Sequence, residues 1–164
     1  MKSKINALIC LYEIIGGILG VCITLYYIFF SINLAFKADI PLTNRLLSLF
    51  IFIIIIALYI LSFIGGFCLW KKKKKGIILS KIVQVFQIPY IITSSFTYAF
   101  ISGLQLGPTV TVSSKIFKFA GLFYLGSSFN IHFGSGIKYI ILGINIIPIL
   151  VIYYLIKIEK TWEI

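Results

Sequence analysis

Residues 46–70 read LLSLFIFIIIIALYILSFIGGFCLW, and the five residues that follow, 71–75, are all lysine. At a rise of 1.5 Å per residue, about 20 apolar residues cross the roughly 30 Å hydrocarbon core of a bilayer. This stretch is longer than that and carries no charge. Lysines directly after an apolar segment are typical of the cytoplasmic side of a membrane span. The stretch therefore predicts a transmembrane helix that ends at the cytoplasmic surface.

The composition of the whole chain agrees with this prediction. Of the 164 residues, 60% are apolar and 12% are charged, with 15 basic and 4 acidic side chains. A water-soluble domain carries about 25% charged residues, so most of this chain requires hydrocarbon as its surroundings. The net charge of +11 does not indicate nucleic-acid binding, because the aromatic residues lie in apolar runs and are not interleaved with basic residues as in a nucleic-acid-binding groove.

Four apolar runs are long enough to be membrane spans; they cover about residues 8–35, 46–70, 77–96 and 137–156. The first run is longer than the apolar part of a signal peptide, so we expect it to be retained as an anchor. The sequence thus predicts an all-α membrane protein, a four-transmembrane-helix bundle that forms a single integral membrane domain over residues 1–164.

The basic residues set the expected orientation of this bundle. Lys2 with Lys4, the lysine turn at residues 71–75, and Lys157 with Lys160 all fall on one side if there are four spans. The positive-inside rule assigns that side to the cytoplasm. We therefore expect a multi-pass protein of the cell (inner or plasma) membrane with both termini cytoplasmic. We expect anionic lipid headgroups at the basic turn, with docking of an acidic partner as the alternative; the turn consists of Lys71, Lys72, Lys73, Lys74 and Lys75.

A segment between the third and fourth spans, about residues 97–136, has the alternation of β-strands. Residues 109–113 read TVTVS and residues 129–133 read FNIHF, and both alternate apolar with polar side chains. Residues 96–100, FTYAF, alternate in the same way, so the end of the third span is open between residues 93 and 102. We expect a small antiparallel β element that caps the outer ends of the helices.

Glu13 is the only acidic residue that apolar sequence surrounds on both sides, and a carboxylate inside a bilayer is costly. The third span carries Lys81 and Gln84, and it enters the membrane from the same side as the first. One interpretation is an intramembrane polar pair of Glu13 with Lys81, supported by Gln84. The other is that Lys81 extends to the headgroups while Glu13 bonds to backbone or water. The residues alone do not decide between the two.

Small and amide residues predict how the helices pack. Gly16 and Gly20 are four residues apart, which permits close approach of a second helix. Asn145 lies near the middle of the fourth span, where we expect its amide to bridge to another helix.

Residues that carry chemistry are few. His132 is the only histidine, so we predict no metal and no cofactor. Cys10, Cys22 and Cys68 lie in apolar runs, which excludes a disulfide framework. The chain has no glycine-rich phosphate loop and no nucleophile elbow. We therefore do not expect an enzyme.

The residues Glu13-Ile14-Ile15-Gly16, together with Tyr98, Ala99 and Ser102-Gly103-Leu104, are similar to parts of the first and third helices of small multidrug resistance transporters. Such transporters also have four spans, and the resemblance implies that Glu13 is the site for protons and cations. It covers fewer than a dozen positions, and this chain adds a long exterior segment and a five-lysine turn. We treat the resemblance as chance. Transport nevertheless remains the alternative prediction for the function.

The predicted function follows largely from what is missing. We expect a small polytopic membrane protein that acts as a non-catalytic accessory, assembly or interaction subunit of a membrane complex. Its expected partners are the lipid bilayer and either another membrane protein or further copies of itself, with no nucleic acid. The alternative is a small proton- or cation-coupled transporter that uses Glu13.

Overall fold

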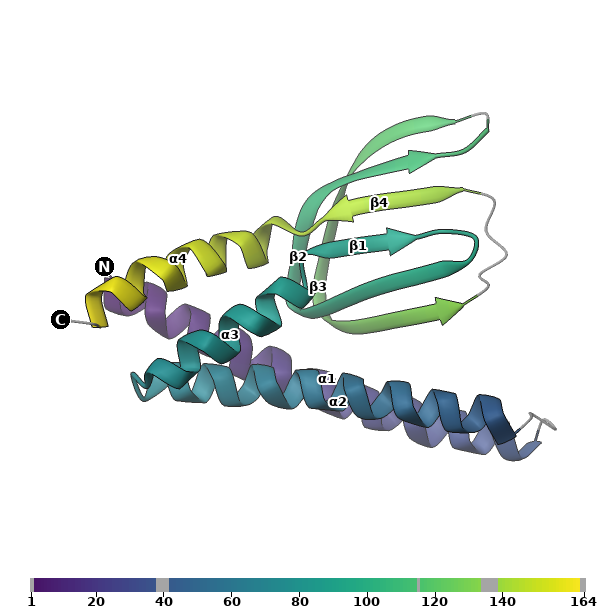
Figure 1. Cartoon of the computed structure of the whole chain (residues 1–164), viewed down its shortest axis with the longest axis horizontal. Coiled ribbons are helices and arrows are strands. Elements are labelled where there is room, and N and C mark those ends of the chain that lie inside the picture. Colours follow the sequence, from purple (N-terminus) through teal and green to yellow (C-terminus); the bar gives the residue numbers. More distant parts are fainter. Residues whose placement is uncertain (1, 38–41, 115, 134–138, 163–164) are drawn as a thin grey trace.

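The computed structural model describes residues 2–37, 42–114, 116–133 and 139–162. In chain order the elements are α1 (Lys2–Lys37), α2 (Leu42–Trp70), α3 (Lys74–Phe86), β1 (Pro89–Ile92), β2 (Phe96–Val112), β3 (Phe117–Phe133), β4 (Ile140–Ile144) and α4 (Ile146–Trp162). Figure 1 shows a layer of helices with a curved sheet beside it.

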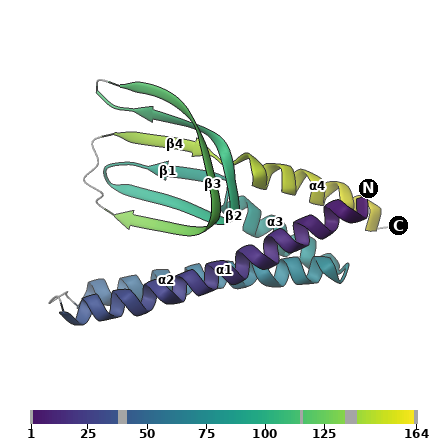
Figure 2. The same cartoon turned by 180° about the vertical axis from the view of Figure 1, so that it is seen from behind.

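The two longest helices, α1 and α2, run side by side over most of their length and diverge toward the end where the termini lie (Figures 1 and 2). Glycines bring their backbones together: a Cβ atom added at Gly17 would lie 2.8 Å from the carbonyl oxygen of Tyr59 in α2. A Cβ atom at Gly20 would collide with the ring of Tyr59. Close contact of this kind is what small residues permit between apolar helices, and Gly20 lies at this contact.

The sheet is antiparallel and folds back on itself. Its order is β1-β4-β2-β3, with an additional pairing of β1 with β2. The first part of β2 pairs with β1 through residues 97–99, the last part pairs with β4 through residues 109–112, and β1 pairs with β4. The strands β1, β4 and the two halves of β2 therefore form a closed ring, and β3 follows β2 along its whole length.

Both long strands bend at the same level, as Figure 1 shows. Gly103 of β2 stands opposite Gly126 of β3 in the register, and the two residues have φ values of +108° and +136°. Only glycine adopts such φ values without strain. The paired glycines thus allow β2 and β3 to turn together, so that one half of each strand faces the helices and the other half faces away.

The predicted four-helix membrane bundle is wrong. The run predicted as the third span, residues 77–96, divides into the end of α3 and the strand β1, and the run at 137–156 divides into β4 and α4. Among the described residues, two helices are long and apolar enough to cross a membrane, at Ile5–Phe30 and Leu46–Trp70. The strands predicted at residues 109–113 and 129–133 lie in β2 and β3, but the sheet is much larger than a cap and includes β1 and β4.

Local chemistry explains why these two runs leave the helix. Proline has no backbone N–H and disfavours a helical conformation in the residue before it, so Pro89 ends the helical run and begins β1. At the other break, the side chain of Asn145 accepts a hydrogen bond from the backbone N–H of Ile147 at 3.2 Å. This is the bond of a helix N-cap, which starts α4 at Ile146 and leaves Ile140–Ile144 free to pair as a strand.

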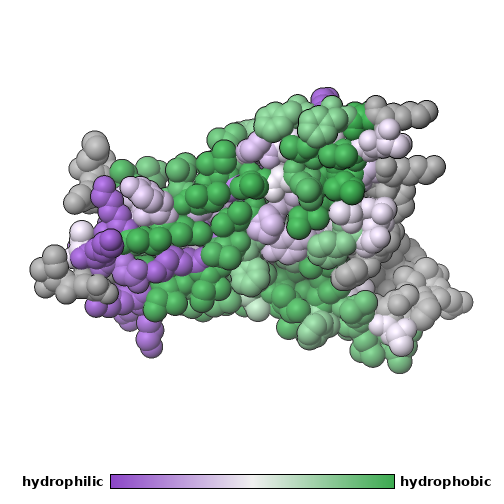
Figure 3. Space-filling view, turned by 45° about the horizontal axis from the view of Figure 1, so that its top comes forward, coloured by the Kyte–Doolittle hydropathy of each residue, from purple (hydrophilic) through white to green (hydrophobic). Residues whose placement is uncertain are grey.

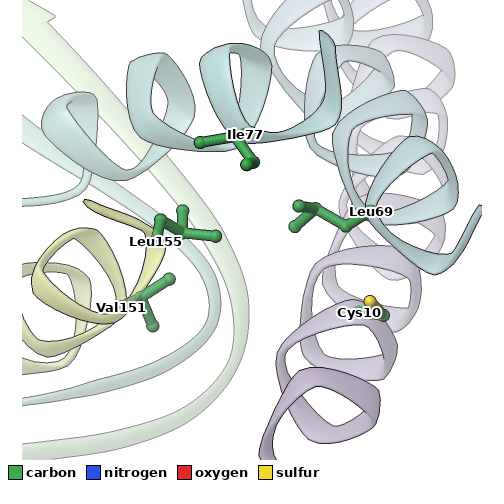
Figure 4. Close-up of a cluster of buried hydrophobic side chains, with 5 residues drawn as sticks. All are labelled: Cys10, Leu69, Ile77, Val151 and Leu155. Atoms are coloured by element: carbon green, nitrogen blue, oxygen red, sulfur yellow. The ribbon is translucent and has the colours of Figure 1, made fainter. Parts of the chain in front are cut away.

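The start of α1, the turn between α2 and α3, and the end of α4 lie together at one end of the molecule (Figure 1). We call this the basic end; in Figure 3 the hydrophilic side chains gather there, and apolar side chains cover most of the rest. Beneath it the helices share an apolar cluster, drawn in Figure 4, of Cys10, Leu69, Ile77, Val151 and Leu155. The cysteines Cys10, Cys22 and Cys68 are all free thiols.

Candidate functional site

Buried polar side chains gather where the helices meet the bend of the sheet, and we call this group the polar junction. All of its members are at most 2% exposed: Glu13, Ser62, Ser80, Gln84, Gln87, Ser102, Ser127 and Asn145. They come from α1, α2, α3, β2 and β3, from the residue after α3 and from the residue before α4. Because an unpaired buried polar group costs free energy, the partners of these side chains show what the junction does.

Glu13 of α1 is fully buried and bonded to α3. The hydroxyl of Ser80 donates to its Oε2 atom, and Gln84 Nε2 donates to its Oε1 atom at 3.0 Å. Ser80 and Gln84 are four residues apart and therefore lie on one face of α3. Gly65 of α2 leaves room for this contact, since a Cβ atom there would come within 3.0 Å of Ser80 Oγ. Both carboxylate oxygens of Glu13 thus have a donor.

The structure corrects the expected pair of Glu13 with Lys81. Lys81 Nζ instead lies 2.8 Å from Glu159 Oε2 in α4, and both side chains are partly exposed. Successive residues on a helix are 100° apart, so Lys81 points away from the face on which Ser80 contacts Glu13. Gln84, which we expected beside Glu13, does bond to it.

Gln87 connects the end of α3 with the bend of the sheet. Its Oε1 atom accepts hydrogen bonds from the backbone N–H of Ser102 at 3.1 Å and from the hydroxyl of Tyr12 at 3.3 Å. The hydroxyl of Ser62 in α2 donates to the backbone oxygen of Glu13 at 3.2 Å and lies 3.3 Å from the hydroxyl of Ser102. One polar chain therefore joins α1, α2, α3 and β2.

Asn145 holds the other side of the bend. Besides capping α4, its Oδ1 atom accepts from the backbone N–H of Leu106 at 3.1 Å, and its Nδ2 atom donates to the carbonyl of Leu104 at 3.3 Å. The sequence predicted that Asn145 bridges to another helix. It bridges to the strand β2, because the run that contains it is not one continuous helix.

Three more side chains bond to backbone oxygens near the bend. The hydroxyl of Tyr59 donates to Ile101 at 3.0 Å, and that of Ser127 donates to Gly16 at 2.9 Å. The hydroxyl of Tyr98 donates to Phe86 at the end of α3, at 2.7 Å. The junction therefore binds backbone oxygens of α1, β2 and the end of α3 to side chains of neighbouring elements.

Sequence reasoning found part of this site. It identified Glu13, Gln84 and Asn145, but it gave Gly16 a helix-packing role. A Cβ atom at Gly16 would lie 2.8 Å from the backbone carbon of Ser102, so this glycine makes room for β2. Ser80 was not among the predicted residues, although its position four residues before Gln84 places the two on one helix face.

Within the described ranges, no three His, Cys, Asp or Glu side chains lie close enough to hold a metal ion. Residues 98–104, the supposed third helix of the transporter resemblance, are part of the strand β2. The lysines of the basic turn, Lys71–Lys75, are exposed and lie away from the junction, at the basic end. The side chain of His132 lies outside the described part of the chain.

No protein family, curated protein or solved structure matches the chain.

Proposed function

We propose that the protein is a non-catalytic accessory or assembly subunit of a membrane complex, anchored by α1 and α2 as two spans. The surface of these helices supports the anchor: exposed large apolar side chains surround both, among them Phe29 at 72%, Phe50 at 61% and Ile53 at 66% exposure. A monomeric protein in water rarely exposes so large an apolar surface. Acyl chains are its natural surroundings.

Two spans keep the orientation that the lysines favour. An even number of crossings leaves the basic end on one side, which the positive-inside rule assigns to the cytoplasm. Ser62 lies eight residues before Trp70, the last residue of α2, which corresponds to a depth of about 12 Å at 1.5 Å per residue. The polar junction then lies near the middle of the bilayer. Irregular backbone is tolerated at that depth only when protein groups satisfy it, and the bonds of Gln87 and Asn145 to β2 meet this requirement.

The outer half of the sheet is also apolar. Phe117 is 77% exposed and pairs with Val112, which in turn pairs with Ile140 of β4. Farther along the same face, Phe123 is 70% exposed and stands opposite Leu106. Residues that stand opposite one another in a sheet share a face. This face therefore continues the apolar surface of the helices, and Figure 3 shows apolar side chains over this part of the molecule.

The observation that carries the accessory role is the free edge of β3. Among the described strands, β3 pairs with β2 alone, so the outer edge of a 17-residue strand is left without a partner strand. An open edge is a template for strand addition, and hydrocarbon offers no partner for its N–H and C=O groups. A strand from another membrane protein would satisfy both the edge and the apolar face.

The same geometry weighs against the transport alternative. A carboxylate that binds and releases protons or cations needs access to both sides of the membrane. Glu13 is 0% exposed, and donors from α3 hold both of its oxygens. In this arrangement the carboxyl group fastens α1 to α3.

The test combines extraction and flux. We expect mild detergent to extract the chain within a larger assembly that contains a second protein in fixed ratio. Phe119→Lys, which places a charge beside the free edge, should release that protein, while Lys118→Gln on the same strand should keep it.

In liposomes the purified chain should give no proton or cation flux above empty vesicles. A flux that Glu13→Gln abolishes and Glu159→Gln preserves would establish the transporter instead.

A further inference from the structure

We propose that the basic end is a binding site for anionic phospholipid headgroups, composed of the α2–α3 turn together with the last turns of α4. This inference rests on the proposed insertion of α1 and α2 in a membrane. It goes beyond a role in orientation, because it assigns a selective lipid site and names the residues of two separate elements that form it.

The two elements bring their charges to one place. Lys71–Lys75 are all exposed, and Lys157 and Lys160 of α4 are exposed as well. Packing of α3 on α4 and the ion pair of Lys81 with Glu159 hold the two elements together. Glu159 is already bonded to Lys81, so it does not neutralise the other lysines directly. Figure 3 shows the resulting concentration of hydrophilic side chains at this end.

The backbone of Lys72 is an independent observation. Its φ is +54°, and in the described residues it is the only residue other than glycine with a positive φ. Lys73 N donates to the carbonyl of Cys68, and Lys72 N donates to that of Leu69, both at 2.9 Å. These are the two bonds of the Schellman motif, in which glycine usually occupies the position of Lys72. Lysine in this conformation costs free energy that glycine would not. We take this cost as a sign that the charge of Lys72 has a function.

The position of the lysines identifies the ligand. They follow Leu69 and Trp70 directly at the end of an apolar helix, and Trp70 is 55% exposed. Tryptophan prefers the headgroup region of a bilayer, so the ammonium groups lie at the level of lipid phosphates. Each lysine near an anionic surface is expected to strengthen binding about fivefold. A soluble polyanion would not require this alignment with the apolar boundary.

The experiment measures lipid selectivity around the full chain. The protein is reconstituted in phosphatidylcholine vesicles that contain a trace of spin-labelled phosphatidylglycerol or spin-labelled phosphatidylcholine, and the motionally restricted fraction of each label is compared. We expect phosphatidylglycerol to be enriched several-fold, and the enrichment to fall as salt is raised. Selectivity should fall by up to about fivefold in Lys72→Gly, and by more in the Lys157→Gln, Lys160→Gln double variant, which removes two charges. It should be unchanged in Lys118→Gln, a lysine of β3 that is remote in sequence from both elements.

Lys72→Gly separates a charge role from a structural one. Glycine should raise the resistance of the chain to unfolding in detergent while it lowers lipid selectivity. Equal restriction of the two labels, or full selectivity in the turn and α4 variants, would refute the site. Equal displacement of the labelled lipid by inorganic polyphosphate and by unlabelled phosphatidylglycerol would show that the surface takes any polyanion, and would also refute it. Removal of the chain from vesicles by sodium carbonate would instead refute the membrane anchor.

Discussion

The chain contains two pairs of apolar runs that look alike in sequence and fold differently. The runs in α1 and α2 remain helical from end to end, whereas those at residues 77–96 and 137–156 change from helix to strand or from strand to helix. All four runs are long enough to be membrane spans, so length alone does not distinguish them. Single residues inside the second pair, above all Pro89 and Asn145, mark the change. An apolar run therefore leaves the helix where a proline or a backbone-bonding side chain such as Asn145 stands at the break.

The first pair also shows what polar residues do when they leave a helix intact. Glu13 and Thr24 lie within α1, and neither interrupts it. The hydroxyl of Thr24 donates to the carbonyl of Gly20 four residues earlier, at 2.7 Å, and so bonds within its own helix. Glu13 bonds sideways to α3. Asn145 differs because its side chain bonds to backbone groups on both sides of a break.

Asn145→Leu should therefore cause the largest loss in the free energy of unfolding. The substitution leaves the N–H groups of Leu106 and Ile147 without their acceptor and removes the donor to the carbonyl of Leu104. A buried group that loses its partner costs about 1–3 kcal/mol, so we expect a loss of about 3 kcal/mol or more in the free energy of unfolding. Denaturant titration in detergent, followed by far-ultraviolet circular dichroism, measures it.

The matched control for that change is Asn130→Leu. Asn130 is exposed on β3, and its amide makes a single long contact of 3.4 Å with Ser128. We expect a change within about 0.5 kcal/mol, the usual range for surface substitutions. Equal losses for the two asparagines would mean that the break at Asn145 does not depend on its side chain, and the explanation of the contrast would be incorrect.

Gly20→Ala tests the uninterrupted pair and should have an intermediate effect. The added methyl group would collide with the ring of Tyr59, which is 1% exposed and has no room to move. Overpacking in a dense core costs about 1–3 kcal/mol, and we expect a loss within that range. Gly121→Ala is the control, since nothing lies within 4 Å of a Cβ atom there. Thermal unfolding in detergent compares the two, and a loss at Gly121 as large as that at Gly20 would contradict the close contact of α1 with α2.

The sequence was sufficient to predict α1 and α2, two groups of strands and the gathering of lysines at one end. These features depend on local pattern: long charge-free runs, two-residue alternation and charge at the ends of apolar segments. The extent of the sheet was not predictable in this way. β1 and β4 are four and five residues long and consist of the same apolar residues as a span. They become strands because β2 bends and offers both of its halves for pairing.

The polar junction was predictable only in part, for a related reason. Because a charge inside a bilayer costs free energy, Glu13 stood out in the sequence. For the same reason a lysine was expected as its partner. The partners are instead Ser80 and Gln84, neutral residues whose relevance depends on the rotation of α3 about its axis. That rotation is set by contacts with α2 and α4. The rotation of α3 therefore cannot be predicted from the sequence of α3 alone.

Lys81→Met should have the smallest effect. The ion pair of Lys81 with Glu159 joins side chains that are 28% and 34% exposed, and such pairs contribute at most about 1 kcal/mol because water and salt screen them. We expect Lys81→Met to lower the free energy of unfolding by less than that value, and the loss to disappear in concentrated salt. The Lys81→Met, Glu159→Gln double variant should lose no more than Lys81→Met alone. Titration in detergent at two salt concentrations measures it. If Lys81→Met cost several kcal/mol, and the additional change Glu13→Gln restored the loss, then Lys81 would be the counter-ion of Glu13 after all, and the rotation assigned to α3 would have to change.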